Sequence, residues 1–384
     1  MADRGWLKTA LNKTGSPHRT RLVEPERSGS VPKPENAMAD VRLIAASTIA
    51  ALVVSAAMAA DDASLLAEAR QVFQPLPKDM STADAPVTKE RVMLGRMLFF
   101  DPRLTADGNV SCATCHQPAL YGTDARPTSI GVKQRPHPRN APTILNAPLA
   151  FVNHWRGDRE SVEDQADQAL KSPITSGLEE RDVVDRLSRI GGYAALFEAA
   201  FPKDPHPITV KTMAVAIAAY ERTLITPSRF DDYLAGDVAA LSPAARAGLQ
   251  TFIKTGCAAC HSGVGIGGGM YQKFGIVEDY WTATGSRTID KGRADVTKDP
   301  ADLYVFRVPI LRNVAMTAPY FHDGSVATLP DAVRVMARVQ LGTKLSDLEV
   351  NDIVAFLESL TGDLPPEFAA APVLPPAAGI ATQQ

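Results

Sequence analysis

The sequence has few cysteines, few aromatic residues and few strand patterns. Its 384 residues include four cysteines, and Phe, Trp and Tyr together make up 6%. The scarcity of strand patterns predicts a mostly helical, all-α fold. The formal net charge is -3, and no strong basic run follows the N-terminal region, which excludes nucleic acid as a partner. A chain of this length favours two domains.

The first 60 residues are expected to be processed rather than folded. Residues 1–37 are rich in Pro, Arg and Ser and lack apolar periodicity, so we expect a non-structured extension, which translation from Met38 would omit. Residues 38–60 have the three parts of a signal peptide, namely an n-region (38–42), an apolar h-region (43–56) and an A-x-A cleavage site (57–59). We therefore predict export to the periplasm. An uncleaved membrane anchor is the alternative, but the apolar run is short and Ala-rich for a span.

All four cysteines belong to two copies of one motif. Residues 112–116 read Cys-Ala-Thr-Cys-His and residues 257–261 read Cys-Ala-Ala-Cys-His, and C-x-x-C-H is the attachment signature of c-type haem. Two thiols at this spacing form thioethers with the two vinyl groups of one porphyrin, and the adjacent histidine reaches the iron. A redox pair or a four-cysteine zinc site gives the histidines no role. We predict two covalent haem c groups, attached through Cys112, Cys115, Cys257 and Cys260.

A second repeat precedes each haem motif. Gly95 and Phe99 lie on a predicted helix over residues 88–100, and Gly248 and Phe252 lie on another over residues 243–254. Residues four apart share a helix face. The glycine lets another helix cross closely, and the aromatic ring packs near a haem edge. The recurrence favours two cytochrome c-like domains in tandem.

Further helices follow from periodicity and capping signals. Ser346-Asp-Leu-Glu349 is a capping box, and the helix that it opens is expected to bury Ile353, Phe356, Leu357 and Leu360 and to stop at Gly362. Cytochrome c domains close with such a helix packed against the first one. The other predicted helices span residues 63–73, 162–170, 182–190, 208–224 and 329–338.

Several stretches on both sides of the haem motifs make the chain resemble the bacterial di-haem cytochrome c peroxidase family, which includes the MauG-type proteins. These stretches are Gly95–Leu104, Arg139–Thr143, Phe230–Tyr233, Leu311–Asn313 and Thr317-Ala-Pro-Tyr-Phe-His322. The resemblance implies a peroxidatic haem domain over residues 61–226 and an electron-transfer haem domain over residues 227–363. The Pro/Ala-rich tail, residues 364–384, is expected to be disordered.

The resemblance also implies the iron ligands. His116 and His261 match the proximal histidines, and Met336 matches the second ligand of the C-terminal haem. A Met/His pair raises the reduction potential, which suits a haem that receives electrons. Met270 and Met316 are the alternatives for the methionine ligand.

At the N-terminal haem the chain departs from the family. Most members carry a histidine in the loop after the first motif, and it caps the resting iron; the matching residue here is Val132. Valine cannot bind iron, so we expect an open, five-coordinate iron at rest. The alternative is that His137, five residues on, takes the place of the missing ligand.

Three residues match the catalytic set of the family. Glu179 matches the catalytic carboxylate, with Glu180 as the alternative, and Gln165 matches a glutamine of the distal pocket. Cleavage of peroxide needs a group that moves a proton and a polar partner that steadies the developing charge. Trp155 matches a tryptophan between the haems, although this chain reads Trp155-Arg-Gly-Asp158 where the family usually reads Trp-Asp-Gly-Arg.

The resemblance further implies one calcium ion between the two domains. Asn140, Thr317 and Pro319 match its ligands, and they offer a side-chain amide oxygen and two backbone carbonyls, the hard donors that calcium prefers. Members of the family are commonly homodimers, so a homodimer is implied here as well.

The resulting hypothesis is a periplasmic cytochrome c peroxidase. It reduces hydrogen peroxide to water with electrons from a small c-type cytochrome or a copper protein. One alternative is a MauG-type enzyme that oxidises a partner protein. Val132 favours this alternative, whereas Met336 counts against it, because MauG uses a tyrosine on the second haem. The other is a non-catalytic electron-transfer cytochrome, which would not need Glu179 and Gln165.

Overall fold

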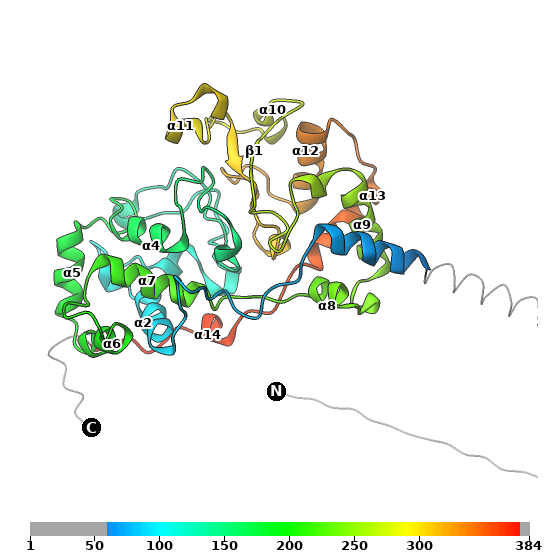
Figure 1. Cartoon of the computed structure of the whole chain (residues 1–384). Coiled ribbons are helices and arrows are strands. Elements are labelled where there is room, and N and C mark those ends of the chain that lie inside the picture. Colours follow the sequence, from blue (N-terminus) through cyan, green and yellow to red (C-terminus); the bar gives the residue numbers. More distant parts are fainter. Residues whose placement is uncertain (1–59, 377–384) are drawn as a thin grey trace, which may run out of the picture. The chain divides into compact units, whose positions relative to one another are not determined.

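Helices carry most of the regular structure in the computed structural model, which describes residues 60–376 (Figure 1). The predicted extension (1–37) and nearly all of the predicted signal peptide (38–60) lie outside the described residues. Residues 60–72 are helical. Within the described part of the chain, no helix combines the length and apolar content needed to cross a bilayer.

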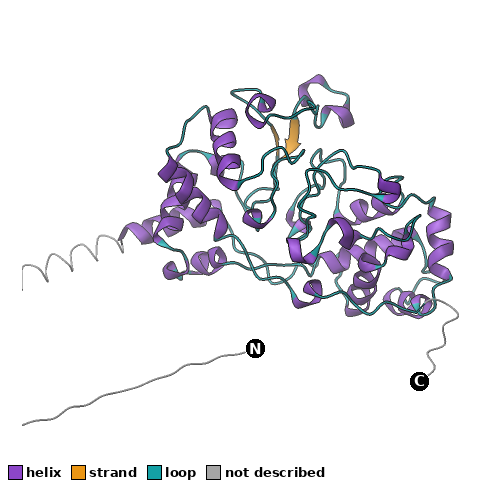
Figure 2. Cartoon of the chain, turned by 180° about the vertical axis from the view of Figure 1, so that it is seen from behind, coloured by secondary structure: helices purple, strands orange, loops and turns teal. Residues whose placement is uncertain are grey.

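The helices are α2 (Lys89–Phe100), α3 (Cys112–Cys115), α4 (Val162–Leu170), α5 (Glu180–Ser188), α6 (Tyr193–Ala200), α7 (Val210–Glu221), α8 (Arg229–Ala235), α9 (Pro243–Lys254), α10 (Tyr280–Thr284), α11 (Ala294–Thr297), α12 (Leu329–Leu341), α13 (Asp347–Glu358) and α14 (Pro366–Ala369). Two short strands, β1 (Tyr271–Lys273) and β2 (Val305–Arg307), pair antiparallel, with Tyr271 opposite Arg307 (Figure 2). The connections between consecutive α-helices and strands range from four residues, between α5 and α6, to 46 residues, between α3 and α4. The expectation of a mostly helical fold is confirmed.

Side-chain caps begin three of the principal helices, α2, α9 and α13. The Thr88 hydroxyl accepts a hydrogen bond from the Arg91 amide at the start of α2, and Ser242 does the same for Ala245 at the start of α9. Ser346 and Glu349 form the predicted capping box of α13. These contacts satisfy amide groups that have no partner within the helix. α13 ends at Glu358, one turn before the predicted stop at Gly362.

Two close helix crossings depend on the repeated glycines. α2 packs against α7, and a Cβ atom on Gly95 would lie 1.8 Å from the Ala216 carbonyl oxygen. α9 packs against α13, and a Cβ atom on Gly248 would lie 1.8 Å from the Asp352 carbonyl oxygen. No side chain fits at these distances. The prediction that each glycine admits a crossing helix is confirmed at both sites.

Each crossing lies in its own hydrophobic core. The first core gathers buried residues from α2 and α4 to α7, including Phe99 and Ile217. The second gathers residues from α8, α9, α12 and α13, including Phe252 and Phe356. The break between the two cores falls between Leu224 and Phe230, close to the predicted boundary at residues 226 and 227.

Each end of the described chain packs into the core that is formed mainly by the opposite half of the sequence. Leu65, Ala69 and Phe73, from the N-terminal end, belong to the second core. Phe368, on α14, is fully buried in the first core against Phe99, with ring centroids 6.3 Å apart. The expectation of a disordered tail is therefore wrong for residues 364–370, because Phe368 buries its ring and Arg96 donates to the carbonyls of Glu367 and Ala370.

Candidate functional site

Each C-x-x-C-H motif opens onto a separate cavity. Cys112, Cys115 and His116 line the first, which has a volume of about 350 Å³. Cys257, Cys260 and His261 line the second, of about 500 Å³. Both volumes fall in the range of cofactor pockets. The helix crossings described above bring Ile217 to the first cavity and Ile353 to the second.

The two motif histidines have the form needed to bind iron. The Nδ1 atom of His116 donates to the Gly122 carbonyl oxygen at 2.9 Å, which leaves Nε2 with its lone pair. Burial lowers the pKa of His116, and it lowers the pKa of His261 to about 4. Both imidazoles are therefore neutral at pH 7, the state in which histidine binds metals.

The four cysteines belong to no metal-binding cluster among the described residues. All four are free of disulfide bonds, and the residues 60–376 contain no group of three or more His, Cys, Asp or Glu placed to hold a metal ion. Burial raises the pKa of Cys112 to about 12 and also raises that of Cys257. Such thiols lack the thiolate character of reactive cysteines. Cysteine pairs beside a cavity and a neutral histidine fit a covalently held haem.

The second cavity also contains the predicted methionine. Met336 lies on α12 and lines this cavity together with His261, whereas Met270 and Met316 are not part of its wall. Met316 is 46% exposed. Phe252 packs at the same cavity, with its ring centroid 6.3 Å from that of His261. Of the three candidate methionines, only Met336 shares a cavity with the motif histidine.

Trp155 lies in a wall that the two cavities share. Its side chain lines both cavities, as do those of Asn140 and His154. The indole Nε1 donates to the Asn140 carbonyl oxygen at 3.0 Å, and the ring centroid lies 6.4 Å from that of His322. Trp155 is therefore a boundary residue between the two cavities.

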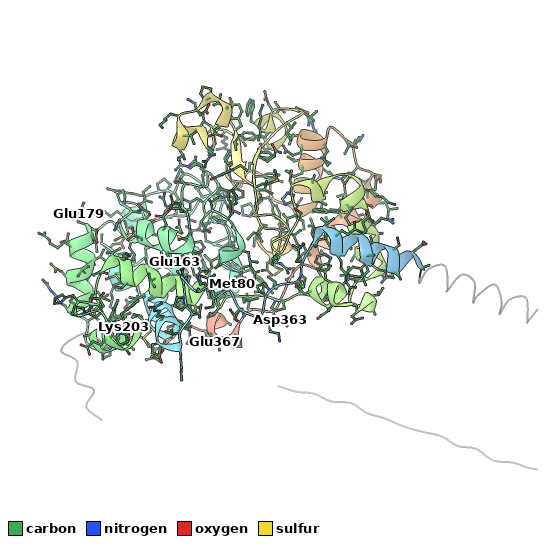
Figure 3. The ribbon with its side chains drawn as sticks, in the orientation of Figure 1. Met80, Glu163, Glu179, Lys203, Asp363 and Glu367 are labelled. Atoms are coloured by element: carbon green, nitrogen blue, oxygen red, sulfur yellow. The ribbon has the colours of Figure 1, made fainter. Side chains whose placement is uncertain are left out.

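The predicted catalytic residues of the first cavity are not all brought together. Gln165 lines the cavity, and its buried Oε1 atom has no hydrogen-bond partner among the described residues. Glu179 is exposed at the N-terminal end of α5 and is absent from the cavity wall, as is Glu180 (Figure 3). The wall in that stretch consists of Ile174, Thr175 and Ser176. The structure therefore does not support Glu179 beside His116, because α5 begins only after the chain has left the cavity.

The loop after the first motif presents His137 rather than Val132 to the cavity. Val132 is fully buried, and its amide donates to the Ile174 carbonyl oxygen at 2.9 Å, outside the cavity wall. His137 is half-buried and lines the cavity, and burial lowers the pKa of its imidazole. His137 thus offers the first cavity a neutral imidazole besides His116.

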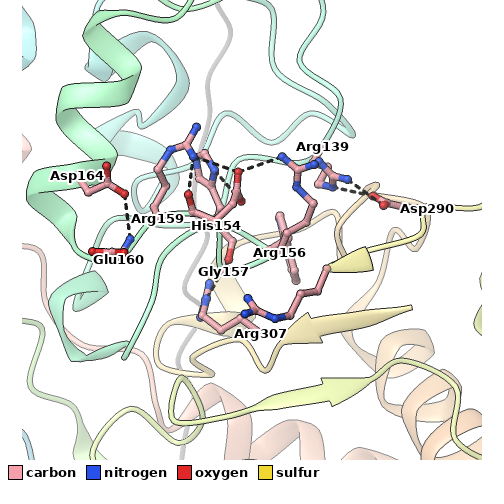
Figure 4. A network of polar contacts seen from close by, with 12 residues as sticks. Arg139, His154, Arg156, Gly157, Arg159, Glu160, Asp164, Asp290 and Arg307 are labelled. Carbon is pink, nitrogen blue, oxygen red and sulfur yellow. Dashed lines mark hydrogen bonds and ion pairs between the residues drawn. The ribbon is translucent and has the colours of Figure 1, made fainter. Parts of the chain in front are cut away.

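An ion-pair network surrounds the shared wall (Figure 4). Arg156 and Arg159 contact the Asp158 carboxylate at 3.0 and 3.2 Å, and His154 approaches it at 3.4 Å. Their charges hold the pKa of Asp158 far below its usual range, against the opposing effect of burial. Because Arg156 and Asp158 pair with each other, the exchanged order of acid and base leaves an ion pair in this loop.

The sequence reasoning missed one buried acid. Glu221, at the end of α7, is 7% exposed, lines the first cavity and has no ion-pair partner among the described residues; the neighbouring Arg222 pairs with Glu163 instead, at 2.8 Å. Burial, reinforced by the charge of Glu163, raises the pKa of Glu221 to about 8. The available signal was the one acid of α7, which directly follows the apolar run Met213–Tyr220.

The predicted calcium ligands share one cavity wall. Asn140, Thr317 and Pro319 all line the second cavity. The Asn140 Nδ2 atom donates to the Arg126 carbonyl oxygen at 2.8 Å, which fixes the orientation of the amide. The Asn140 backbone amide donates to the His322 carbonyl oxygen at 2.8 Å, so this residue joins the first motif's loop to the segment that carries Thr317 and Pro319.

Comparison with known proteins decides the family. The family model for di-haem cytochrome c peroxidase matches residues 89–239. The cytochrome c551 peroxidase of Pseudomonas aeruginosa is 42% identical over 78% of this chain and 86% of its own length. The chain belongs to the di-haem cytochrome c peroxidase family.

Two further relatives show the breadth of this peroxidase family. The methylamine utilization protein MauG of Methylorubrum extorquens is 34% identical over 72% of this chain and 80% of its own. A MauG-like protein associated with microbial copper homeostasis superposes with a TM-score of 0.68 at 31% identity, over 77% of this chain and 97% of that one. The resemblance stated from sequence motifs is confirmed, and a di-haem family accounts for two cavities that each carry a C-x-x-C-H motif.

Proposed function

We propose that this peroxidase carries two covalent haem c groups and reduces hydrogen peroxide to water in the periplasm, with electrons from a small c-type cytochrome or copper protein. The observation that carries the proposal is the pair of cavities, each with two cysteines and a neutral histidine, on either side of Trp155. The signal peptide expected before Ala60 supports the periplasmic location, since haem c is attached outside the cytoplasm.

The chain would hold one haem in each of two cytochrome c-like domains, residues 61–226 and 227–363. The two cores and their glycine-dependent crossings support this division. The helix at residues 60–72 crosses to the second core and α14 crosses to the first, so both domains borrow an element from the far end of the chain.

The first cavity is the proposed peroxide site. When bound, the haem supplies an iron that accepts peroxide and exchanges electrons. His116 would hold the iron from one side through Nε2. Gln165 has a buried Oε1 atom free to accept a hydrogen bond, which suits it to orient a peroxide proton. His137 is neutral and can accept a proton at a ring nitrogen, a task that the exposed Glu179 is poorly placed to perform.

The second cavity is the proposed entry point for electrons. His261 and Met336 line it together, and a His/Met ligand pair favours the reduced iron. Trp155 lies between the cavities and supports electron transfer from the second to the first. Overall, two electrons and two protons convert one peroxide into two waters. We also propose one calcium ion, held by Asn140, Thr317 and Pro319, that ties the two domains together.

Three measurements on one sample of the exported protein test this proposal. Mass spectrometry should show two attached haems per chain. Peroxide should be consumed only with a reduced cytochrome c or copper protein, with two donor molecules oxidised per peroxide. Electron paramagnetic resonance of the oxidised protein should show a high-spin signal from an open first iron. Purely low-spin signals would instead indicate that His137 binds that iron, and a donor that remains reduced in the presence of peroxide would overturn the proposed activity.

A second candidate function is oxidation of a partner protein. The MauG relatives and the MauG-like structure favour it. Valine at position 132 favours it as well, because a valine at this loop position cannot cap the iron as a histidine would. Met336 favours the peroxidase. Turnover with the small redox donor in the absence of any other protein separates the two. A non-catalytic electron-transfer cytochrome is the least supported reading, because the first cavity holds polar groups that a simple carrier does not need.

A further inference from the structure

Arg307 is a buried cation without a carboxylate partner. It is the last residue of β2 and is 6% exposed. Its Nε atom donates to the His154 carbonyl oxygen at 3.2 Å, and Nη1 donates to the Val308 carbonyl oxygen at 3.3 Å. Within residues 60–376, no carboxylate lies within 4.0 Å of its guanidinium, whereas the other arginines labelled in Figure 4, Arg139, Arg156 and Arg159, each pair with an aspartate.

The neighbouring acids are already engaged. Asp158 pairs with Arg156 and Arg159, and Asp290 pairs with Arg139 at 2.6 Å. Burial lowers the pKa of Arg307 to about 10, which leaves it charged at pH 7. A buried charge that is not paired costs several kcal/mol by order of magnitude, so such groups are rarely retained without a counter-charge.

The second cavity has the charge pattern that an anionic cofactor requires. Arg307 lines this cavity together with Cys257, Cys260 and His261, and none of the residues that line it is an aspartate or a glutamate. The first cavity contains acids of its own, Asp101, Asp158 and Glu221, but its wall also carries three arginines, Arg139, Arg156 and Arg159. His322 lines the second cavity too, and its buried Nε2 atom has no hydrogen-bond partner among the described residues. A haem brings two propionate carboxylates, and a guanidinium binds a carboxylate with two parallel hydrogen bonds.

We propose that Arg307 binds a propionate of the haem attached to Cys257 and Cys260 and thereby raises the reduction potential of that haem. The inference rests on the proposed attachment of haem at this motif. A fixed positive charge near the iron stabilises the ferrous state relative to the ferric state, because reduction removes one positive charge from the iron. Arg307 is a positioning residue, since it contacts a carboxylate at the edge of the cofactor and not the reacting iron.

The same residue ties the propionate to the wall between the cavities. The Arg307 backbone amide donates to the Trp155 carbonyl oxygen at 2.8 Å, and its side chain contacts the preceding residue, His154. Anchoring the propionate therefore also fixes the loop that carries Trp155. Loss of Arg307 should change the second haem directly and the first haem little.

The test is a spectroelectrochemical titration of the intact two-haem protein and of Arg307→Gln. We expect the ferric–ferrous equilibrium of the second haem to shift at least tenfold toward ferric iron, which is a fall of about 59 mV for one electron, with the first haem unchanged. Arg293→Gln is the matched control, because Arg293 packs beside β1, pairs with Asp302 at 3.5 Å and does not line the cavity. Both haems of this variant should have the reduction potentials of the parent protein.

Mass spectrometry of each variant separates this inference from the proposed function. Fewer than two attached haems in the parent protein would overturn both. Two haems with unchanged potentials in Arg307→Gln, or equal shifts of both haems, would overturn the role of Arg307 alone. A parent potential that varies with phosphate concentration would show that the guanidinium binds a free anion instead of a propionate.

Arg307→Lys provides a second variant if Arg307→Gln does not fold. Lysine keeps the charge but cannot form two parallel hydrogen bonds. We expect it to retain most of the potential and to shift the propionate-bending band of the second haem in resonance Raman spectra. An unshifted band in this variant would contradict contact between Arg307 and the propionate.

Discussion

The indole Nε1 of Trp155 donates to the carbonyl oxygen of Asn140 at 3.0 Å, and these two residues line both cavities. The carbonyl oxygen of Trp155 accepts the Arg307 amide at 2.8 Å. Trp155 is thus held through its side chain by the loop after the first motif and through its backbone by β2. Because Trp155 is held at both its side chain and its backbone, its replacement should affect communication between the two cavities.

Replacement of Trp155 by phenylalanine should slow electron transfer between the two haems. The smaller ring loses the hydrogen bond to Asn140 and leaves a gap in the shared wall, which lengthens the path between the cavities. We expect at least a tenfold lower kcat with the redox donor, while the rate at which the donor reduces the second haem stays unchanged. Stopped-flow absorbance at the two haem bands measures both steps.

Trp281→Phe is the control for this prediction. Trp281 is a half-buried tryptophan on α10 that lines neither cavity. Its replacement should leave both steps at the parental rate. Equal kcat values for Trp155→Phe and the parent protein would exclude a role for the indole in the relay.

Alanine at Gly95 or Gly248 should strongly destabilise the domain that contains it. The added Cβ atom would lie 1.8 Å from the carbonyl oxygen of Ala216 or Asp352, so the crossing helices must separate. Overpacking within a core costs about 1–3 kcal/mol, and a clash with helix backbone should cost at least as much. Thermal unfolding followed by circular dichroism measures the loss. Gly269→Ala, where a Cβ atom meets nothing within 4 Å, should leave the unfolding temperature almost unchanged.

Glu221 should make the stability fall as the pH rises. Its native pKa is raised from 4.5 to about 8, so the folded state retains a proton that the unfolded state releases. The resulting stabilisation is complete below about pH 4.5 and is lost as the pH rises toward 8, at up to about 1.4 kcal/mol per pH unit. Glu221→Gln should flatten this dependence in denaturant titrations between pH 5 and 8. The exposed Glu198→Gln should retain the parental slope, and a parental slope in Glu221→Gln would contradict the assignment.

The buried pair of Asp231 and Arg312 should be essential for the second core. The Arg312 side chain is 0% exposed and contacts the two Asp231 oxygens at 2.8 and 2.9 Å. Asp231→Asn would leave the guanidinium buried without a counter-charge, at a cost of about 3–5 kcal/mol. Asp232→Asn, at the exposed neighbouring position, should cost almost nothing. Chemical denaturation at pH 7 compares the two variants, and equal stabilities would refute the prediction.

The same pair predicts sensitivity to acid. Hydrogen bonds and the charge of Arg312 lower the native pKa of Asp231 below 3.8, in spite of its burial. Its contribution to stability is therefore present above about pH 3.8 and is lost as the pH falls through the lower native pKa. The Asp231→Asn variant should lose less stability than the parent between pH 4 and 2.

Local signals in the sequence predicted the helices and the cofactor motifs well. Ser346 and Glu349 carry their capping information within four residues, and the structure begins α13 there. The two glycines gave a correct indication of tertiary contact because only a close approach of backbone explains a repeated small residue on a buried helix face. Both C-x-x-C-H motifs lie at cavities.

The sequence could not predict contacts that depend on how a loop leaves a cavity. Glu179 lies three residues after Ser176, which lines the first cavity, yet the turn into α5 carries it out to solvent. Phe368 lies in a Pro/Ala-rich segment whose composition suggests disorder, but one aromatic ring finds a place in a remote core. The isolation of Arg307 from carboxylates becomes visible only when β2 is placed beside residues far away in the chain.

The burial of Phe368 beside Phe99 limits when the first core can finish folding. In the proposed export to the periplasm the N-terminal end emerges first, so residues 60–200 would arrive before α14 does. The first core would therefore keep an unfilled apolar site beside Phe99 until Phe368 arrives, when nearly the whole polypeptide has been translocated. A molecule cut short before residue 368 should be a preferred substrate for periplasmic proteases, which would remove incomplete chains before a lone haem domain accumulates.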